Sequence, residues 1–375
     1  MKDVMGLIYT GENDARLREL TLTRAVAALP VAGRYRTIDF LLSSMVNSGV
    51  RNVGIITQKN YHSLMDHLGS GKEWDLHIKH DGLFILPPFL TRDNIGVYTG
   101  LLDALRSNAG YLRRSRQEYI ILTNSHVILN MNFDEMLQTH IDSGADITLL
   151  YSHKETLEPL PNREECAYLG LDGQRVTSFE IDPAVPSYPN ESLEVYVMKR
   201  ELLRYLVDQG VAHGMHDFNR DIIQRLVNEG SMTILGYPYD GKAWRIDSVQ
   251  AYYQFHMDLL DTRVRDTLFS DDRPVYTKVR DDMPARIVSG AQVANSLIAD
   301  ASIIEGTVEN SVLFRGVHVA AGAVVRNSII MQDAQIQSGA ELNHCILDKQ
   351  AIIRRNGRLI GPAAYPIVIA KNVMI

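Results

Sequence analysis

Two clusters of arginine residues have the side-chain type and spacing that most directly suggest chemistry. Arg24, Arg34 and Arg36 lie within thirteen residues, and Arg354 and Arg355 lie together near the C-terminus. A guanidinium group is planar and always charged, so it can hold two oxygens of a phosphate at once, whereas lysine acts as a point charge. The clusters therefore suggest a site for a phosphorylated ligand. A charged loop exposed to solvent explains the same pattern equally well.

No comparable pattern suggests a metal centre or a reactive thiol. His77, His80 and Asp81 have a loose metal-like spacing, but nothing else in the sequence converges on them. The two cysteines, Cys166 and Cys345, are too far apart in sequence for a zinc ribbon or a disulfide framework. We therefore expect no metal ligands in this chain and a reduced, cytoplasmic location.

Length and composition indicate a globular protein of more than one domain. The chain has 375 residues, of which 45% are hydrophobic and 22% charged. No apolar run approaches the ~18–20 residues of a membrane-spanning helix. A net charge of −7 argues against nucleic acid as the main partner, because phosphate backbones require clustered basic residues. A local basic pocket for a small phosphorylated ligand remains compatible with this charge.

The first 260 residues alternate short apolar runs with helical patterns. Strands are expected at residues 4–9, 53–57, 119–122 and 146–151, and helices at 40–48, 100–110 and 133–143. This alternation predicts an α/β domain with a mostly parallel sheet, in which ligands bind beyond the carboxyl ends of the strands. The loops after Tyr9 and after Thr123 are therefore the expected places for chemistry.

The pattern of the sequence changes after Asp261. Residues 263–286 carry five Asp and five Arg without a helical stripe, which indicates a linker. Beyond it, aliphatic residues recur every six positions, and the phase slips at Val312 and Leu347 as if a corner carried an extra residue. A period of six is typical of a left-handed β-helix, although a stack of ordinary short strands is the alternative. The open ends of such a coil favour oligomerisation.

Several longer motifs give the sequence a specific resemblance. They are VAGRYRTIDF at 31–40, NSGV at 47–50, TGLLDA at 99–104, DIT at 146–148 and MDLL at 257–260. With the hexapeptide repeats, they make the chain similar to the bacterial glucose-1-phosphate adenylyltransferase (ADP-glucose pyrophosphorylase) family over almost its whole length. The resemblance implies a nucleotidyltransferase-like (Rossmann-like) α/β domain at 1–262, a linker at 263–286 and a left-handed β-helix at 287–375. It also implies an Mg²⁺-dependent transfer from ATP to glucose 1-phosphate, which gives ADP-glucose and diphosphate.

The triphosphate loop of that family is altered in this chain. The family's Gly-Gly-x-Gly-x-Arg-Leu corresponds to residues 11–17, where Gly11 and Arg16 remain but Glu12 and Asp14 replace two glycines. Their side chains add bulk and negative charge where the backbone of a family member approaches phosphate. A like-charge contact in a partly desolvated pocket costs several kcal/mol.

The other catalytic positions are altered as well. Val26 replaces the lysine of an Ala-Lys-Pro-Ala stretch, and Ser125 replaces the metal-binding Asp of a Gly-Asp-His motif. Arg245 stands where the family has its second metal-binding Asp, with Asp247 as the nearest substitute. Asp182 replaces the lysine of the sugar-phosphate motif Phe-x-Glu-Lys-Pro. Since each such group contributes ~10²–10⁴-fold to catalysis, their joint loss predicts negligible transferase activity.

The resemblance is therefore strongest to the family's non-catalytic, GlgD-type regulatory subunits. This implies a role in glycogen biosynthesis, a catalytic partner subunit that alone holds Mg²⁺, and a cytoplasmic heterotetramer under allosteric control. One alternative is an active transferase with a rearranged site, in which Glu12, Asp14 or Asp247 binds the metal. Another is a free-standing sensor of phosphorylated sugars or nucleotides.

Some positions keep the family's binding residues. Gly11, Arg16 and Gln58 match the nucleotide pocket, and Asp217 matches the sugar pocket. The family's regulators are phosphorylated sugars and adenine nucleotides, and Arg24 matches an arginine implicated in binding them. The candidates for an effector site are therefore Arg24, Arg34, Arg36, Arg354 and Arg355.

Overall fold

The computed structural model describes residues 3–11, 14–88, 98–155 and 166–375, which form two compact units. Unit 1 contains Met1–Glu12, Phe40–Ala243 and Asp272–Val275. Unit 2 contains Asn13–Asp39, Trp244–Asp271 and Tyr276–Ile375. The segments 13–39 and 244–271 thus pack with the C-terminal repeats. The division expected from the sequence, an α/β domain at 1–262, a linker at 263–286 and a β-helix at 287–375, stays a prediction.

A mixed β-sheet forms the centre of unit 1. Among the described residues, nine strands make it, in the order β5-β4-β1-β6-β11-β8-β12-β10-β9. Their bounds are Val4–Tyr9 (β1), Asn52–Ile56 (β4), Gly82–Leu86 (β5), Tyr119–Asn124 (β6), Ile147–His153 (β8), Ala167–Asp172 (β9), Arg175–Ile181 (β10), Asn190–Lys199 (β11) and Ile234–Pro238 (β12). The four strands expected from apolar runs correspond to β1, β4, β6 and β8. β1 is buried along its whole length, as a strand covered on both faces must be.

The sheet is less parallel than the sequence pattern predicts. β5, β4, β1 and β6 run parallel, and so do β8 and β12. However, β11 runs antiparallel to both β6 and β8, and β9 and β10 form an antiparallel edge. The expectation of a mostly parallel sheet is right for the N-terminal half, whereas antiparallel pairs predominate in the rest. β9, β10 and β11 follow one another without the long crossover that parallel pairing requires.

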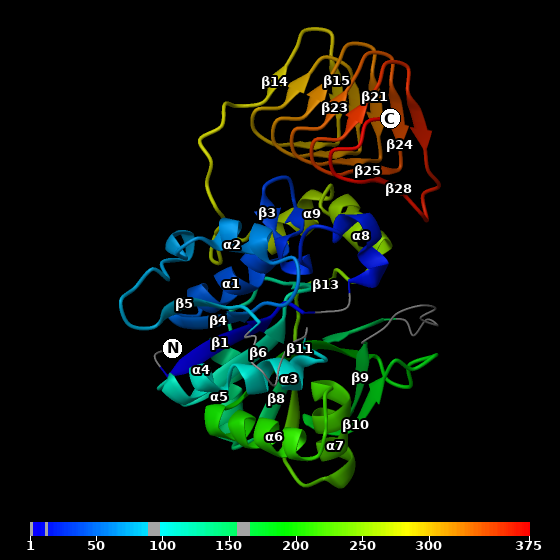
Figure 1. Cartoon of the computed structure of the whole chain (residues 1–375). Helices are drawn as coiled ribbons and strands as arrows, with labels where there is room; N and C mark the ends of the chain where they lie inside the picture. Colours follow the sequence, from blue (N-terminus) through cyan, green and yellow to red (C-terminus); the bar gives the residue numbers. More distant parts are fainter. Residues whose placement is uncertain (1–2, 12–13, 89–97, 156–165) are drawn as a thin grey trace. The chain divides into compact units, whose positions relative to one another are not determined.

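Helices cover both faces of this sheet (Figure 1). Their bounds are Thr37–Asn47 (α1), His62–Leu68 (α2), Lys72–Trp74 (η3), Leu101–Ser107 (α3), Ala109–Arg114 (α4), Asp134–Ser143 (α5), Arg200–Ala212 (α6), Phe218–Gln224 (η4, a π-helix) and Arg225–Glu229 (α7), and a short strand Val127–Ile128 (β7) follows β6. The three predicted helices correspond to α1, to α3 with α4, and to α5. On one face, Leu7, Leu122 and Leu149 of the strands share a buried core with Leu105 of α3 and Leu203 of α6.

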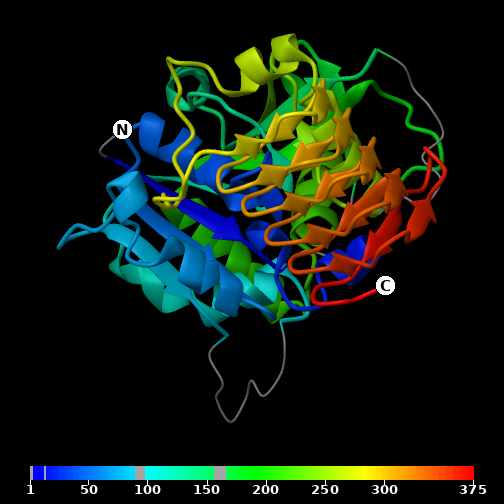
Figure 2. The same cartoon turned by 90° about the horizontal axis from the view of Figure 1, so that it is seen from above.

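Three parallel sheets form the C-terminal part of unit 2, and the chain visits them in turn. The described residues give five strands to each sheet, in the orders β14-β17-β20-β23-β26, β15-β18-β21-β24-β27 and β16-β19-β22-β25-β28. Figure 2 shows successive turns stacked in chain order from yellow to red. The strands are Arg286–Ile287 (β14), Gln292–Ala294 (β15), Leu297–Ile298 (β16), Ile303–Ile304 (β17), Thr307–Glu309 (β18), Val312–Leu313 (β19), His318–Val319 (β20), Val324–Arg326 (β21), Ile329–Ile330 (β22), Gln335–Ile336 (β23), Glu341–Asn343 (β24), Cys345–Leu347 (β25), Ile352–Ile353 (β26), Arg358–Ile360 (β27) and Ile367–Ile369 (β28). The predicted triangular coil of hexapeptide repeats is therefore present, and its left-handed turn stays a prediction.

The turns of this coil are shorter than three full hexapeptides. Paired positions on one sheet, from Ile303 through His318 and Gln335 to Ile352, are separated by 15, 17 and 17 residues. The slips in phase are therefore corners that lack a residue, and the expected extra residue is wrong. Asn327 and His344, with φ of 45° and 51°, make two of these tight corners in the left-handed region.

A ladder of small polar side chains supports the same corner from turn to turn. The hydroxyl of Ser311 accepts a hydrogen bond from the Ser328 N–H at 3.1 Å. The hydroxyl of Ser328 in turn accepts one from the Cys345 N–H at 3.1 Å. Because all three residues are fully buried, each bond satisfies a backbone donor that water cannot reach.

The remaining elements of unit 2 come from the two segments that pack with the coil. They are Ala15–Leu20 (η1), Val26–Ala28 (η2), Pro30–Val31 (β2), Tyr35–Arg36 (β3), Trp244–Arg245 (β13), Val249–Asp258 (α8) and Thr262–Leu268 (α9). α9 corrects the expectation of a linker without helix from residue 263. Asp261 caps this helix by accepting a hydrogen bond from the Arg263 N–H, and Leu268 is buried at its end. Within the residues that the structure describes, no helix has the length and hydropathy needed to cross a membrane.

Candidate functional site

A cavity of about 470 Å³ lies at the carboxyl ends of β1 and β6 in unit 1. Tyr9 ends β1 and Gly11 follows it, while Asn124 ends β6, and all three line the cavity. The structure thus places a cavity at the loops after Tyr9 and after Thr123, where the alternation of strands and helices predicts chemistry.

A strained and buried carboxylate, Glu194, lies at the wall of this cavity. It sits where the register of β11 shifts against β8, and its φ of 54° is in the left-handed region. The residue is 1% exposed. Asn124 and Asn219 donate hydrogen bonds to its carboxylate, and His126 Nε2 lies 3.6 Å from Oε2. A left-handed non-glycine residue costs ~1–2 kcal/mol and persists where its surroundings hold it, as this polar network does.

The charges around the cavity are mainly negative. Of the described residues that line it, Asp182, Glu194 and Asp217 carry carboxylates, and Arg220 carries the guanidinium. Arg220 Nη2 already lies 3.8 Å from Asp182 Oδ2, and the Arg220 N–H donates to Asp217 Oδ1 at 2.9 Å. A phosphate dianion entering here would meet like charges, at a cost of several kcal/mol. The carboxylates and amides are better suited to accept hydrogen bonds from the hydroxyls of an uncharged ligand.

The structure brings together several of the positions expected from the sequence. Gly11, Asp182 and Asp217 all line the cavity described above. Gln58 lies beside it, because its Nε2 donates to the Tyr98 carbonyl at 2.6 Å and its Oε1 accepts from the Tyr9 hydroxyl at 3.5 Å. The space next to the Gly11 backbone is occupied by these side chains, since a Cβ at Gly11 would lie 2.3 Å from Gln58 Oε1.

The residues at the family's metal positions do not fit Mg²⁺. Ser125 is fully buried just after β6 and offers a neutral hydroxyl, where a hard cation prefers carboxylate oxygen. Arg245 of β13 is 8% exposed and offers a fixed positive charge. Among the described residues, no group of three or more His, Cys, Asp or Glu side chains is arranged to hold a metal ion.

Two further replaced positions, Asp14 and Val26, belong to unit 2. Val26 is 2% exposed in η2, so the position of the family's lysine is a buried apolar contact. The backbone carbonyl of Asp14 accepts hydrogen bonds from the Leu17 N–H and the Thr21 hydroxyl at the start of η1. Arg16 lies within η1 itself. Glu12 lies outside the described residues.

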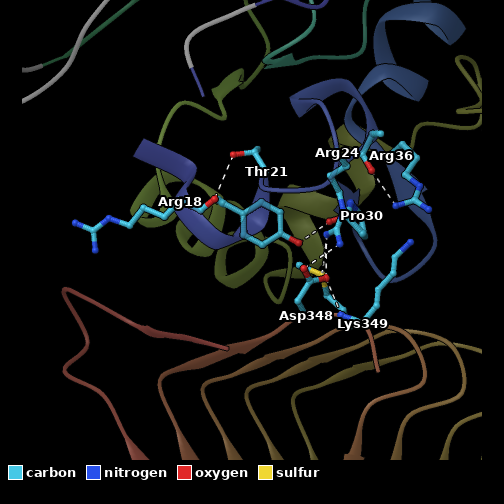
Figure 3. A network of polar contacts seen from close by, with 10 residues as sticks. Arg18, Thr21, Arg24, Pro30, Arg36, Asp348 and Lys349 are labelled. Atoms are coloured by element: carbon cyan, nitrogen blue, oxygen red, sulfur yellow. Dashed lines mark hydrogen bonds and ion pairs between the residues drawn. The ribbon is translucent and has the colours of Figure 1, made fainter. Parts of the chain in front are cut away.

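Arg24 and Arg36 are brought together, but Arg24 is already bound to a carboxylate. Figure 3 shows its guanidinium directed at Asp348, with Nη1–Oδ1 and Nη2–Oδ2 distances of 2.9 Å each. The two side chains are 3% and 1% exposed. Burial and the Arg24 charge lower the pKa of Arg36 to about 10, while burial, Arg36 and Arg24 lower that of Lys349 to about 7. Arg24 as a ligand of an effector phosphate stays a prediction, and such a ligand would have to displace Asp348.

The remaining arginine candidates are more exposed. The side chains of Arg34, Arg354 and Arg355 face solvent, and the backbone N–H of Arg355 donates to Gln337 on the coil. The residues that sequence reasoning missed are Glu194, Asp348 and Lys349. The sequence contains only weak indications of two of these residues. Glu194 is a charged residue within the apolar run of β11, and Asp348 directly follows the apolar strand β25.

The fold and the site define a class of protein. A nucleotidyl transferase family model matches residues 5–262, and a GlmU-like C-terminal hexapeptide model matches residues 283–363. The first match covers the α/β sheet with its cavity and also the segments 13–39 and 244–262 of unit 2, and the second covers most of the coil.

Individual relatives make the assignment more specific. The chain is 39% identical to "Glycogen biosynthesis protein GlgD" of Bacillus subtilis over 99% of this chain and 96% of the relative. It is 38% identical to a GlgD protein of Geobacillus stearothermophilus, over 86% of this chain and 82% of the relative. It is 32% identical to a glucose-1-phosphate adenylyltransferase of the same organism, over 87% and 84%. The chain belongs to the glucose-1-phosphate adenylyltransferase family and resembles its GlgD members.

Proposed function

We propose that this chain is a catalytically deficient, regulatory subunit of a hetero-oligomeric glucose-1-phosphate adenylyltransferase in glycogen biosynthesis. It assembles in the cytoplasm with a catalytic homologue, as a heterotetramer in which the C-terminal coil contributes to assembly. The partner holds Mg²⁺ and forms ADP-glucose from ATP and glucose 1-phosphate. The present chain modulates that activity.

The charge of the unit 1 cavity carries this proposal. Three carboxylates line it, and the guanidinium of Arg220 is paired with one of them. Transfer to a sugar phosphate requires cations at the non-bridging oxygens, because negative charge develops there in the transition state. Asp182, at the family's lysine position, gives the opposite charge. Ser125 and Val26 support the same conclusion, since neither can neutralise a phosphate.

The relatives support the presence of a GlgD-type chain and an adenylyltransferase chain in the same organism. Geobacillus stearothermophilus has both a GlgD protein and an adenylyltransferase similar to this chain. Two homologous chains in one organism suit a division between a catalytic and a regulatory subunit, and the present chain lacks the charged groups at the family's catalytic positions. Phosphorylated sugars or adenine nucleotides are the expected effectors, with Arg24, Arg34, Arg36, Arg354 and Arg355 as the candidate contacts.

The test is an assay of ADP-glucose formation by this chain alone, by a catalytic homologue alone and by the co-expressed pair. We expect no turnover above background from this chain, and a changed maximal rate or effector response in a complex that elutes as a heterotetramer. Turnover by this chain alone, abolished by Asp247→Ala, would establish the rearranged site instead. Separate elution at micromolar concentration with unchanged partner kinetics would refute the regulatory role.

A further inference from the structure

Glu194 holds a buried carboxylate at the wall of the unit 1 cavity, in a conformation that few residues other than glycine adopt. Its φ of 54° lies in the left-handed region, and the residue is 1% exposed. Glycine would take the same conformation without strain, and it would leave the space of the side chain to the cavity. Backbone strain that persists at the wall of a cavity points to a role for the side chain itself.

The hydrogen bonds around Glu194 suit an ionised carboxylate. Asn124 Nδ2 donates to Oε2, and Asn219 Nδ2 donates to Oε1 at 3.1 Å. The Tyr196 hydroxyl donates to Asn219 Oδ1, so the amide of Asn219 is oriented with its N–H groups toward Glu194. Both carboxylate oxygens therefore act as acceptors, as they do in the ionised form. The wall of the cavity thus carries a fixed negative charge.

This charge makes the cavity unfavourable for a phosphorylated sugar. Asp182 and Asp217 add two further carboxylates to the lining, and the Arg220 guanidinium lies 3.8 Å from Asp182. The two aspartates are exposed, so water and salt weaken their repulsion of an anion. Glu194 is almost fully buried and is screened far less. Glu194 therefore contributes most of the discrimination against a phosphoryl group.

The rest of the cavity suits a ligand with hydroxyl groups and no charge. Aromatic side chains, each at most 5% exposed, form part of its lining: Tyr9, Tyr98, Tyr196 and Phe218. An aromatic ring offers an apolar surface to the C–H face of a sugar ring, while carboxylates accept hydrogen bonds from the sugar hydroxyls. The volume of about 470 Å³ lies within the ~300–1,000 Å³ that is typical of small-molecule sites.

We propose that Glu194 is the specificity-determining residue of this cavity, which binds an unphosphorylated sugar and rejects a phosphorylated one. The carboxylates of Asp182 and Asp217 accept hydrogen bonds from the hydroxyls of the ligand, and the fixed charge of Glu194 excludes a phosphoryl group. This ligand binds to the chain without a partner subunit, so the site goes beyond the regulatory role.

The test is a titration of the full chain alone, followed by saturation-transfer difference NMR of the ligand. Glucose and maltose are the neutral probes, and glucose 1-phosphate is the competitor, so displacement of the neutral sugar reports on one shared site. A neutral sugar should bind to the wild-type chain with saturation. Glu194→Gly should lower the concentration of glucose 1-phosphate that displaces half of the neutral sugar at least about tenfold, because a buried like charge is removed.

Two further variants locate the effect within the cavity. Glu191→Gln is the matched control, because Glu191 lies on the same strand, is 3% exposed and is paired with Lys154 at 2.9 Å. Glu191 is not among the described residues that line the cavity, so this variant should keep the selectivity of the wild type. Asp217→Asn should weaken binding of the neutral sugar several-fold, since a charged acceptor is replaced by a neutral one. Asparagine can still cap η4 as Asp217 does.

Glu194→Asn keeps the test decisive if Glu194→Gly does not fold, because asparagine tolerates the left-handed region and removes the charge. It should shift the selectivity in the same direction. Failure of both neutral sugars to bind to the wild-type chain would overturn the proposal, and so would equal displacement by glucose 1-phosphate from the wild type and from Glu194→Gly. Neither result depends on turnover, so each is distinguishable from a failure of the regulatory role, which the assay with the catalytic homologue detects.

Discussion

The Arg24–Asp348 pair offers a quantitative test of how unit 2 is held together. The variants are Asp348→Asn, Arg24→Met and the double variant. Both side chains are almost fully buried and the contact is bidentate. Removing one partner of a buried pair leaves an uncompensated charge, which costs about 3–5 kcal/mol.

The surroundings predict that the two single changes are not equal. Without Asp348, the Arg24 charge is left beside two other cationic side chains, Arg36 and Lys349. Asp348→Asn should therefore reach the upper end of that range. Without Arg24, the Asp348 carboxylate still accepts a hydrogen bond from the Lys349 N–H at 2.6 Å and remains close to the two cations. Arg24→Met should therefore cost less, about 2–3 kcal/mol.

The assay is urea unfolding of unit 2, followed by the fluorescence of Trp244 in a Trp74→Phe background. Trp244 belongs to unit 2, where its indole N–H donates to Asp258. The exposed pair Arg326–Glu309 is the control, because at a comparable distance of 2.8 Å its partners are 43% and 37% exposed. Glu309→Gln should cost less than about 1 kcal/mol. If Asp348→Asn costs no more than Glu309→Gln, or less than Arg24→Met, the account of the pair is refuted.

Three further results are expected. Burial lowers the pKa of His256 to about 4, so this residue alone should lower the free energy of unfolding by about 3 kcal/mol as the pH drops from 6.5 to 4. His256→Gln should remove that contribution from the pH dependence measured by urea unfolding, and the separate contribution of His140, whose pKa burial also lowers to about 4, should remain. The folded pKa of Lys349 lies below its usual 10.5, so the unfolded chain binds more protons and stability should rise from pH 7 to 10.5; Lys349→Met should flatten this rise in denaturation curves. Ser328→Ala leaves the buried Cys345 N–H unpaired and should cost about 1–3 kcal/mol in urea unfolding, whereas Ser338→Ala, at an exposed turn, should change little.

Local sequence patterns predict those strands and repeats whose formation depends on the burial of nearby apolar residues. Continuous apolar runs bounded by polar residues identify β1, β4, β6 and β8, because a strand buried on both faces needs such a run. The six-residue period identifies the coil, since each face of it repeats the same inward position. The direction of β11 and the grouping of 13–39 with the coil depend on long-range packing, which no window of sequence contains.

The cavity could be predicted in part. Its place after β1 and β6 follows from the topology of α/β sheets, and Asp182 and Asp217 follow from the family motifs. Glu194 could not be predicted in this way, because its importance comes from a register shift within β11 and from partners on β6 and η4. A charged residue within a buried strand is the one feature of the sequence that indicates it.

The coil repeat explains why Asp348 is important and how such a residue can be recognised. Residues directly after the third strand of each turn form a column: Ala299, Phe314, Met331 and Asp348. Segments from elsewhere in unit 2 pack along this column, since a Cβ at Gly33 would lie 3.6 Å from Ala299, the His256 ring lies 5.9 Å from that of Phe314, and Arg24 contacts Met331 Sδ at 3.9 Å. An aspartate in an otherwise apolar column must meet a cation from the packed segment, because a buried carboxylate without a partner is not tolerated. Arg24 is that cation, so its position in the sequence indicates attachment of the N-terminal segment to the coil at least as strongly as it indicates a ligand.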